Sequence, residues 1–236
     1  GFDSLKEAFE DKEDKIYAIE TGLSSDPAMN WRCSWLDKKQ LVSFSDAHSP
    51  EKLGREATVV DLKKMDYNEL FDAIAHKEEG KLKKTIEFFP QEGKYYSDGC
   101  RQCEVRTTPA ETKKYNGRCP KCKKNITKGV IGRVDELADR KEGEKPKGAP
   151  GYESIVPLRE LVAMAIGTGV NTKSVGIIYY KLIEKFGNEF SVLLEADVGE
   201  IKKIEERAGK AIEAMREKKL KIEPGYDGKF GVVGLE

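Results

Sequence analysis

Four cysteines in two closely spaced pairs constrain this chain more than any other feature of its sequence. Cys100 and Cys103 form the first pair, Cys119 and Cys122 form the second, and fifteen residues separate the pairs. Two such turns can point four sulfur atoms at one centre, as in a tetrahedral structural zinc site. Two disulfides are an alternative that the lack of a secretory signal pattern disfavours, and an iron–sulfur cluster is another.

Basic residues are concentrated around these cysteines. Residues 100–133 contain ten lysines and arginines against two acidic residues, whereas residues 1–60 contain eight basic and twelve acidic ones. The whole chain has zero net charge, which excludes a globally basic nucleic-acid binder. A local patch can still contact phosphates, and a solvated surface is the alternative. The residues predicted to bind nucleic acid here are Lys113, Lys114, Arg118, Lys121, Lys123 and Lys124.

Strand and helix signals alternate through the first ninety residues, which predicts a parallel α/β layer. The predicted elements are a helix capped by Ser4, strands near 16–20, 41–44, 57–60 and 84–89, and a helix over 67–76. These strands are too few for a closed barrel of about eight units.

Residues 139–152 are rich in glycine, proline and charge, which is typical of a linker. From residue 156 onward the apolar residues follow a helical period. Asn171 and Asp197 are predicted helix caps, and Gly187 is a predicted helix end.

Asp46 and His48 flank one alanine at the predicted carboxyl end of the second strand. Alternation places residues two apart on the same side of a strand. A carboxylate and an imidazole directed at one point are a pair of metal ligands. The spacing alone leaves open a capping aspartate beside a packed histidine, and two ligands alone cannot hold a catalytic metal.

Two long segments resemble the endonuclease Q family of DNA-repair nucleases, found in archaea and some bacteria. They are residues 18–32 (AIETGLSSDPAMNWR) and 43–56 (SFSDAHSPEKLGRE). The cysteine module and residues 222–228 are similar to the same family. The resemblance covers essentially the whole chain but only the later part of the family's length.

The resemblance implies an α+β protein of several modules. Residues 1–92 would be the C-terminal part of a PHP-type (polymerase and histidinol phosphatase) β/α barrel, and residues 93–138 a zinc-binding module. Residues 139–152 would be a linker, and residues 153–236 a helical, helix-hairpin-helix-like DNA-binding domain.

The resemblance also implies a cytoplasmic, metal-dependent endonuclease that nicks DNA 5′ of uracil, hypoxanthine or an abasic site. It assigns Asp46 and His48 as catalytic ligands of Zn, Mg or Mn, beside a structural zinc on the four cysteines. Its partner would be DNA, especially duplex with deaminated bases, with no membrane and no small-molecule cofactor. Glu20 would line the cleft, Trp31 would stack on a base and Arg32 would contact a phosphate. A loop-capping Glu20 and a buried Trp31 are the structural alternatives.

The chain differs from the family in one major respect. The family's early His-x-His motif is absent, and the sequence has only two histidines. We therefore expect a fragment that mainly binds DNA and is inactive alone, from an endodeoxyribonuclease parent. One alternative function is a PHP phosphoesterase that acts on a small phosphate ester. Another is a helicase-associated, UvrD-like DNA-binding module without its own chemistry, although no G-x-x-x-x-G-K-[ST] motif is present.

Overall fold

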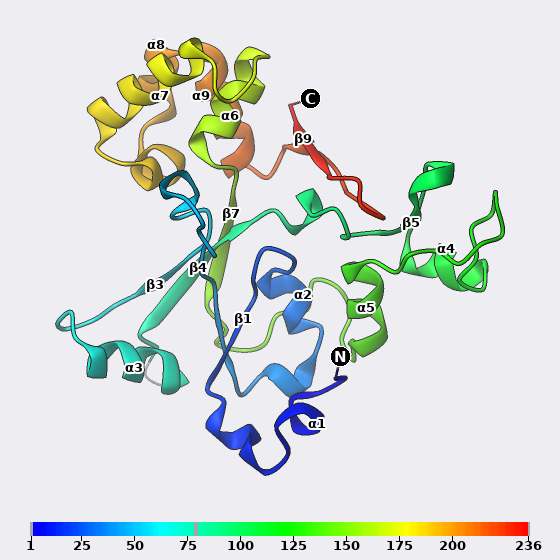
Figure 1. Cartoon of the computed structure of the whole chain (residues 1–236). Helices are drawn as coiled ribbons and strands as arrows, with labels where there is room; N and C mark the ends of the chain where they lie inside the picture. The colour runs from blue at the N-terminus through cyan, green and yellow to red at the C-terminus, as the bar shows by residue number, and fades with distance from the viewer. Residues whose placement is uncertain (1, 78–79, 236) are drawn as a thin grey trace. The chain divides into compact units, whose positions relative to one another are not determined.

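The chain forms two compact units in the computed structural model, which describes residues 2–77 and 80–235 (Figure 1). The first unit contains Gly1–Ser154 and Pro224–Gly231, and the second contains Ile155–Glu223 and Val232–Glu236. The finer division into four segments at residues 92, 138 and 152 stays a prediction.

The first unit holds short helices and strands, which alternate only as far as β2. They are α1 (Leu5–Phe9), β1 (Ala18–Glu20), α2 (Pro27–Trp31), β2 (Gln40–Val42), β3 (Ala57–Val60), α3 (Tyr67–Ala75), β4 (Leu82–Phe88), β5 (Asp98–Cys100), β6 (Val105–Thr107), α4 (Pro109–Lys114), α5 (Val130–Leu137) and β7 (Gly151–Ile155). The hydroxyl of Ser4 caps α1, as predicted, by accepting the Glu7 N–H. Asp26, Asp66 and Thr108 cap α2, α3 and α4 in the same way.

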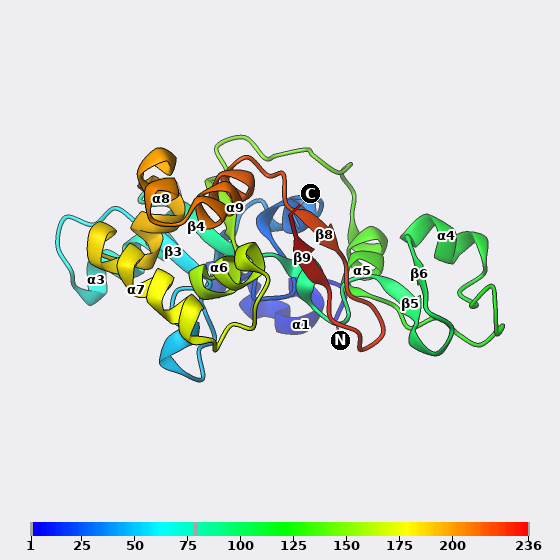
Figure 2. The ribbon, with the colours of Figure 1, turned by 90° about the horizontal axis from the view of Figure 1, so that it is seen from above.

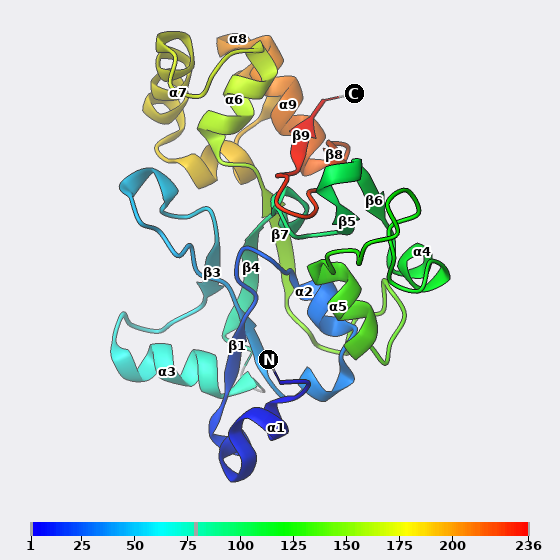
Figure 3. The same ribbon diagram turned by 45° about the vertical axis from the view of Figure 1, so that its right-hand side comes forward.

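The strands of the first unit belong to separate small sheets. β1 and β2 are parallel, with Glu20 opposite Val42, so this part of the predicted parallel layer is confirmed. β3, β4 and β7 form a three-stranded sheet in which β3 and β4 are antiparallel, so the prediction is wrong there (Figure 3). A parallel connection needs a helix packed on the sheet face. α3 instead leaves Leu70 and Phe71 exposed.

The second unit is a cluster of helices with one small hairpin (Figure 2). Its elements are α6 (Leu158–Ile166), α7 (Lys173–Phe186), α8 (Val198–Ile204), α9 (Glu206–Arg216), β8 (Lys221–Glu223) and β9 (Val232–Gly234). Gly187 ends α7 and Asp197 caps α8, as predicted. The cap position of α7 is Thr172, one residue after the predicted Asn171.

Apolar side chains from all four helices form the core of the second unit. Fully buried members include Leu161, Leu182, Leu193, Ile201 and Ile212. The longest helix, α7, has 14 residues. Across the described ranges, no helix has both the length and the apolar character needed to cross a membrane.

One arginine completes the hydrogen bonding of a helical turn in this core. The π-helical turn Ser191–Glu195 follows α7, and its carbonyl groups need donors from elsewhere in the unit. Arg216 Nε donates to the Leu193 carbonyl at 2.8 Å, Nη1 donates to that of Ala196 at 2.8 Å, and Nη2 donates to that of Val192 at 2.9 Å. A single guanidinium therefore satisfies three carbonyl groups.

We predict that Arg216→Ala destabilises the second unit by about 2–4 kcal/mol, because it leaves several carbonyl groups without their charged donor. Native-state hydrogen exchange of the Val162 and Ile212 amides measures this change without requiring the whole chain to unfold in one step. Lys210→Ala is the control, since it removes only an exposed pair with Glu206 and should leave the exchange rates nearly unchanged. Equal effects of the two changes would contradict the prediction.

Candidate metal centre and nucleic-acid interface

The four cysteines lie on two tight turns of the first unit. Cys100 ends β5, and Cys103 closes the 3-10 turn that follows it. Glu104 then adopts a left-handed conformation (φ +52°) and leads into β6, which pairs with β5. Cys119 begins the second turn, in which the Cys119 N–H donates to the Lys124 carbonyl at 2.8 Å.

Paired backbone hydrogen bonds join the two turns. The Gly99 N–H donates to the Thr127 carbonyl, and the Thr127 N–H donates back to Gly99, both at 2.9 Å. Gly99 has no room for a side chain, because an added Cβ would lie 2.5 Å from the Tyr226 ring and 2.8 Å from the Val105 carbonyl. The close approach of three segments at Gly99 therefore fixes the distance between the two cysteine pairs.

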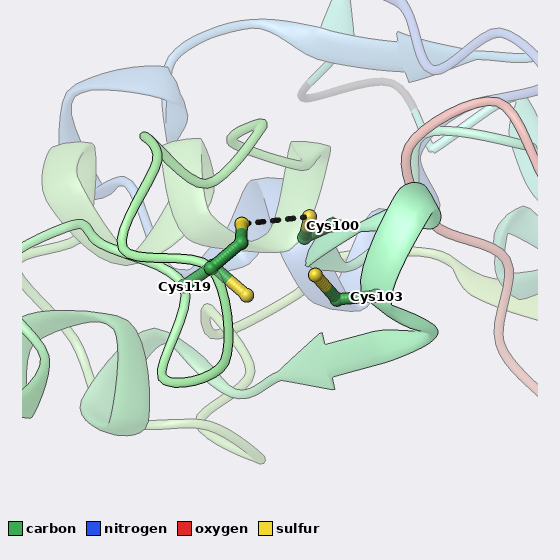
Figure 4. Close-up of side chains that lie close together, drawn as sticks. Cys100, Cys103 and Cys119 are labelled. Atoms are coloured by element: carbon green, nitrogen blue, oxygen red, sulfur yellow. Dashed lines mark hydrogen bonds between the residues drawn. The ribbon is translucent and has the colours of Figure 1, made fainter.

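The cysteine ligand atoms meet at one point, as the spacing predicts. All four sulfur atoms lie within 4.8 Å of one another. Figure 4 shows Cys100, Cys103 and Cys119 with their sulfur atoms turned toward a common centre. Hydrogen bonds from the backbone N–H groups of Cys122 and Lys121 lower the pKa of Cys119 to about 7. The neighbouring Cys122 thiol raises the pKa of Cys103 to about 12, so the four cysteines do not ionise alike without a metal ion. The meeting of four sulfur atoms is what allows this group to hold a metal ion.

The predicted basic residues are exposed around the cysteine cluster, and some of them contact it. Lys121 Nζ donates to the Cys103 carbonyl at 3.0 Å, and Lys123 Nζ donates to the Pro120 carbonyl at 2.9 Å. Lys113 instead pairs with Asp135 at 2.7 Å. Four thiolates around a divalent ion carry a net charge of −2, so nearby lysines also stabilise the cluster electrostatically. The same side chains can thus offset the negative charge of the cysteine cluster or contact phosphates.

Trp31 and Arg32 end α2 and are packed within the first unit. The Trp31 ring meets Tyr152 edge-to-face at 5.6 Å, and Lys145 Nζ lies 5.2 Å from the Trp31 ring centre. Arg32 Nη2 forms a 3.1 Å ion pair with Asp135, and only 15% of its side chain is exposed. Trp31 is half-buried, and the nucleic-acid roles of both residues stay predictions.

Glu20, Asp46 and His48 follow the carboxyl ends of two neighbouring parallel strands. Glu20 is the last residue of β1 opposite Val42, and Asp46 comes four residues after Val42. All three residues are exposed. The His48 Nδ1 lies 2.9 Å from the Asp46 carbonyl oxygen. An Nδ1–H donated to this carbonyl leaves Nε2 as the available ligand atom, a usual arrangement for metal-binding histidines.

An arginine that the motif search did not single out supports the Asp46 loop. Asp46 has a left-handed backbone (φ +45°), an uncommon conformation for a residue with a side chain. Arg55 Nε donates to the Ser45 carbonyl at 2.8 Å, and Nη2 donates to the Asp46 carbonyl at 3.3 Å. Arg55 lies within the matched segment 43–56, but no local pattern distinguishes it from the other basic residues.

Arg55 also lines a cavity of about 480 Å³ within the first unit. The cavity wall combines cationic and aromatic side chains, among them Lys94, Phe88, Tyr95, Tyr96 and Phe230. The Lys94 ammonium lies 5.5 Å from the Tyr95 ring centre and 5.9 Å from that of Phe230. Exposed aromatic rings beside a cation form a surface suited to stacked bases and phosphates.

Solved structures of an endonuclease match this fold along nearly all of the chain. A crystal structure of the novel lesion-specific endonuclease PfuEndoQ from Pyrococcus furiosus is 36% identical, with a TM-score of 0.90 over 99% of this chain and 58% of that one. A crystal structure of endonuclease Q with a 27-mer duplex substrate, which carries an abasic lesion at the active site, is also 36% identical, with a TM-score of 0.85 over 100% of this chain and 59% of that one. The chain resembles endonuclease Q in both sequence and fold. The resemblance expected from residues 18–32 and 43–56 is thus confirmed.

Sequence relatives and a family model agree with this resemblance. The chain is 36% identical to the uncharacterized protein MJ0043 of Methanocaldococcus jannaschii, over 100% of this chain and 30% of that protein. It is 31% identical to the uncharacterized protein YqxK of Bacillus subtilis, over 98% of this chain and 55% of that protein. The family model of the MJ0043 C-terminal domain matches residues 157–219. The chain thus spans about a third to about three fifths of the proteins that it matches.

We predict that the chain binds one divalent metal ion per molecule through the four cysteines, and that Cys119→Ser abolishes this binding. The loss should unfold the local turns, because metal-binding energy in such a module is also folding energy. Elemental analysis after gel filtration measures the metal content. Cys33→Ser is the matched control, since Cys33 is buried outside the cluster and should leave the metal content unchanged. A wild-type chain without bound metal would contradict the prediction.

Proposed function

We propose that this chain is a DNA-binding part of a metal-dependent DNA-repair endonuclease. The complete enzyme would nick the backbone 5′ of a deaminated base or an abasic site. The observation that carries the proposal is the 36% identity to endonuclease Q along essentially the whole chain, including the structure with a duplex substrate. The chain spans 58–59% of those endonuclease chains. The nicking activity is therefore proposed for the complete enzyme and not for this chain alone.

Within this proposal, Asp46 and His48 are ligands of catalytic divalent metals, which would be Zn, Mg or Mn. Their position after β2, next to the end of β1, supports the assignment, since sites in α/β folds gather at the carboxyl ends of strands. Glu20 would line the same cleft, and β1 and β2 would belong to a larger β/α barrel. Metals in such sites stabilise the attacking and leaving oxygens of a phosphodiester. Among the described residues, only the four cysteines gather into a group of three or more metal-capable ligands.

The four-cysteine cluster is proposed to hold a structural zinc ion. Four sulfur donors within 4.8 Å of one another suit tetrahedral zinc, and a site without an open position has no catalytic role. The zinc module would present Lys114, Arg118, Lys123 and Lys124 to DNA phosphates.

The second unit is proposed to bind DNA through a helix-hairpin-helix-like element. Gly167 ends α6 in a left-handed conformation (φ +71°), and α7 starts at Lys173 after an exposed turn. The side chain of Thr172 makes no capping hydrogen bond to α7. The first N–H groups of a 14-residue helix therefore face outward beside Lys173, which suits a backbone phosphate.

We predict salt-sensitive binding of duplex DNA by the isolated chain. Contact with about five phosphates gives a log–log salt slope of about −4.5. The triple change of Lys114, Lys123 and Lys124 to Glu should weaken binding at least tenfold and reduce the slope. Fluorescence anisotropy over a salt series measures both quantities.

The matched control reverses three charges elsewhere in the first unit, at Lys12, Lys15 and Lys38. These residues are exposed and lie outside the basic segment. If the two triple variants bind DNA equally well, the zinc module is not the DNA-binding surface.

We predict that the isolated chain does not nick a duplex carrying one deoxyuridine in the presence of Mn²⁺, because two ligands cannot assemble a catalytic cluster. A longer polypeptide that adds the family's His-x-His segment to this chain should nick 5′ of the uracil. In that polypeptide, Asp46→Ala should remove nicking and leave DNA affinity within about twofold, since phosphate contacts would lie elsewhere. A labelled-duplex assay checks each part, and nicking by the isolated chain would place the active site elsewhere.

A further inference from the structure

Two carboxyl groups are buried opposite each other on the sheet that supports the Asp46 loop. Glu56 is 2% exposed and Glu87 is fully buried. In the antiparallel register, Ala57 lies opposite Ile86, so the same register continued by one residue places Glu56 opposite Glu87. The Phe88 N–H, next along β4, donates to Glu56 Oε1 at 3.4 Å. Like charges directly opposite each other destabilise a sheet, and burial makes the charged forms costlier still.

Glu87 contacts the ends of both strands of the neighbouring parallel sheet. The Thr21 hydroxyl, immediately after β1, donates to Glu87 Oε2 at 2.9 Å. The Ser43 hydroxyl, immediately after β2, lies 3.2 Å from the same oxygen. The Ser43 N–H also donates to the Thr58 hydroxyl of β3 at 2.8 Å. Ser43 begins the segment that continues to Asp46 and His48, so its position is set from β3 and β4.

Each carboxyl group has one oxygen that the described contacts do not satisfy. Glu56 Oε2 is buried and has no hydrogen-bond partner among the described residues, and the same holds for Glu87 Oε1 and the nearby Thr85 hydroxyl. Buried polar atoms are normally paired, and a proton retained on either carboxyl group would turn an unsatisfied acceptor into a donor.

We propose that Glu87 is a positioning residue for segment 43–48, and that it holds this segment fully only while the Glu56–Glu87 pair retains a proton. The inference rests on the proposed function where it concerns Asp46 and His48 as metal ligands. The hydrogen-bonded connection from β4 to Ser43 stands without that function. Removal of the last proton would place two buried negative charges opposite each other and weaken this connection.

The ionisable surroundings of the pair favour retention of a proton. Burial, followed by the nearby Glu87, raises the pKa of Glu56 to about 8, while the hydrogen bond from the Phe88 N–H and the charge of the neighbouring Arg55 oppose the rise. Burial raises the pKa of Glu87 to about 7, against hydrogen bonds from nearby hydroxyl groups. Glu20 from the end of β1 raises the pKa of Glu56, and Asp26 at the start of α2 raises that of Glu87. Burial, followed by the charges of Asp26 and Glu87, raises the pKa of Tyr152 on β7 to about 12.

The sign of the pH effect follows from these directions. The ordinary pKa of a glutamate is about 4.3, so between about pH 4.3 and 8 the folded chain holds protons that the unfolded chain has released. The stabilisation is therefore complete below about pH 4 and is lost as the pH rises through about 7 and 8. The local opening constant of segment 43–48 should rise by up to about tenfold per pH unit for each proton involved.

Amide hydrogen exchange of residues 43–48 in the whole chain tests the proposal. The rates are measured from pH 5.5 to 9 and corrected for the intrinsic effect of pH on exchange. Protection in the wild type should fall at least tenfold across this range. Glu56→Gln should abolish this fall because it removes the opposing charge, and Glu87→Ala should lower protection at all pH values. Glu87→Gln, which keeps an acceptor for Thr21 and Ser43, should restore protection and make it independent of pH. Glu153→Gln, a half-exposed carboxylate on β7, should behave as the wild type.

The proposal would be overturned if hydrogen-exchange protection in the wild type did not change with pH, or if Glu87→Ala left it unchanged. If Glu87→Ala does not fold, the Glu56→Gln and Glu87→Gln profiles decide the question. A second measurement separates this inference from the proposed function: Mn²⁺ is added, and the broadening of the His48 ring signals is recorded by NMR. Broadening in the wild type that weakens in Glu87→Ala supports positioning of a metal site. Absence of broadening in the wild type counts against the metal site, while the exchange profiles still decide the role of Glu87.

Discussion

A buried carboxyl group, that of Glu87, links the β1–β2 sheet to the β3–β4–β7 sheet, and the geometry of the candidate site depends on this link. Neither β1 nor β2 has more than three residues, and together they form an isolated pair. A two-stranded sheet is marginal by itself, so its strand ends need external support. Glu87 supplies that support through Thr21 and Ser43, and Arg55 holds the next carbonyl groups along the chain. The loop of Asp46 and His48 is thus placed by residues of another sheet.

The cysteine module folds with very few buried apolar side chains. Between residues 100 and 128 the buried apolar side chains are Cys100 and Cys119, both members of the cluster. A bound metal ion would supply the energy that a hydrophobic core supplies elsewhere. Lys121, which donates to the Cys103 carbonyl, places a positive charge beside the thiolates. A high lysine content is therefore no independent sign of DNA binding.

Features that depend on residues close together in the sequence could be predicted, whereas features that depend on contacts between distant segments could not. The cysteine cluster, the Ser4 and Asp197 caps and the Gly187 helix end follow from short sequence patterns, and the structure contains them. The antiparallel pairing of β3 and β4 was missed because strand direction depends on where α3 packs, which periodicity does not reveal. Glu56 and Glu87 were missed for a similar reason. They are 31 positions apart, and only the register of two strands makes them neighbours.

The two sets of candidate ligands in the first unit differ in the way that structural and catalytic sites generally differ. The four sulfur atoms come from a compact segment, are partly buried and meet within 4.8 Å of one another. Asp46 and His48 are exposed, lie in the loop that follows β2 and depend on residues outside this loop for their position. A closed set of soft ligands suits a permanent ion, whereas an open pair suits an ion that must also reach a substrate. Loss of the loop support should therefore change the position of Asp46 before it affects the fold around the cysteines.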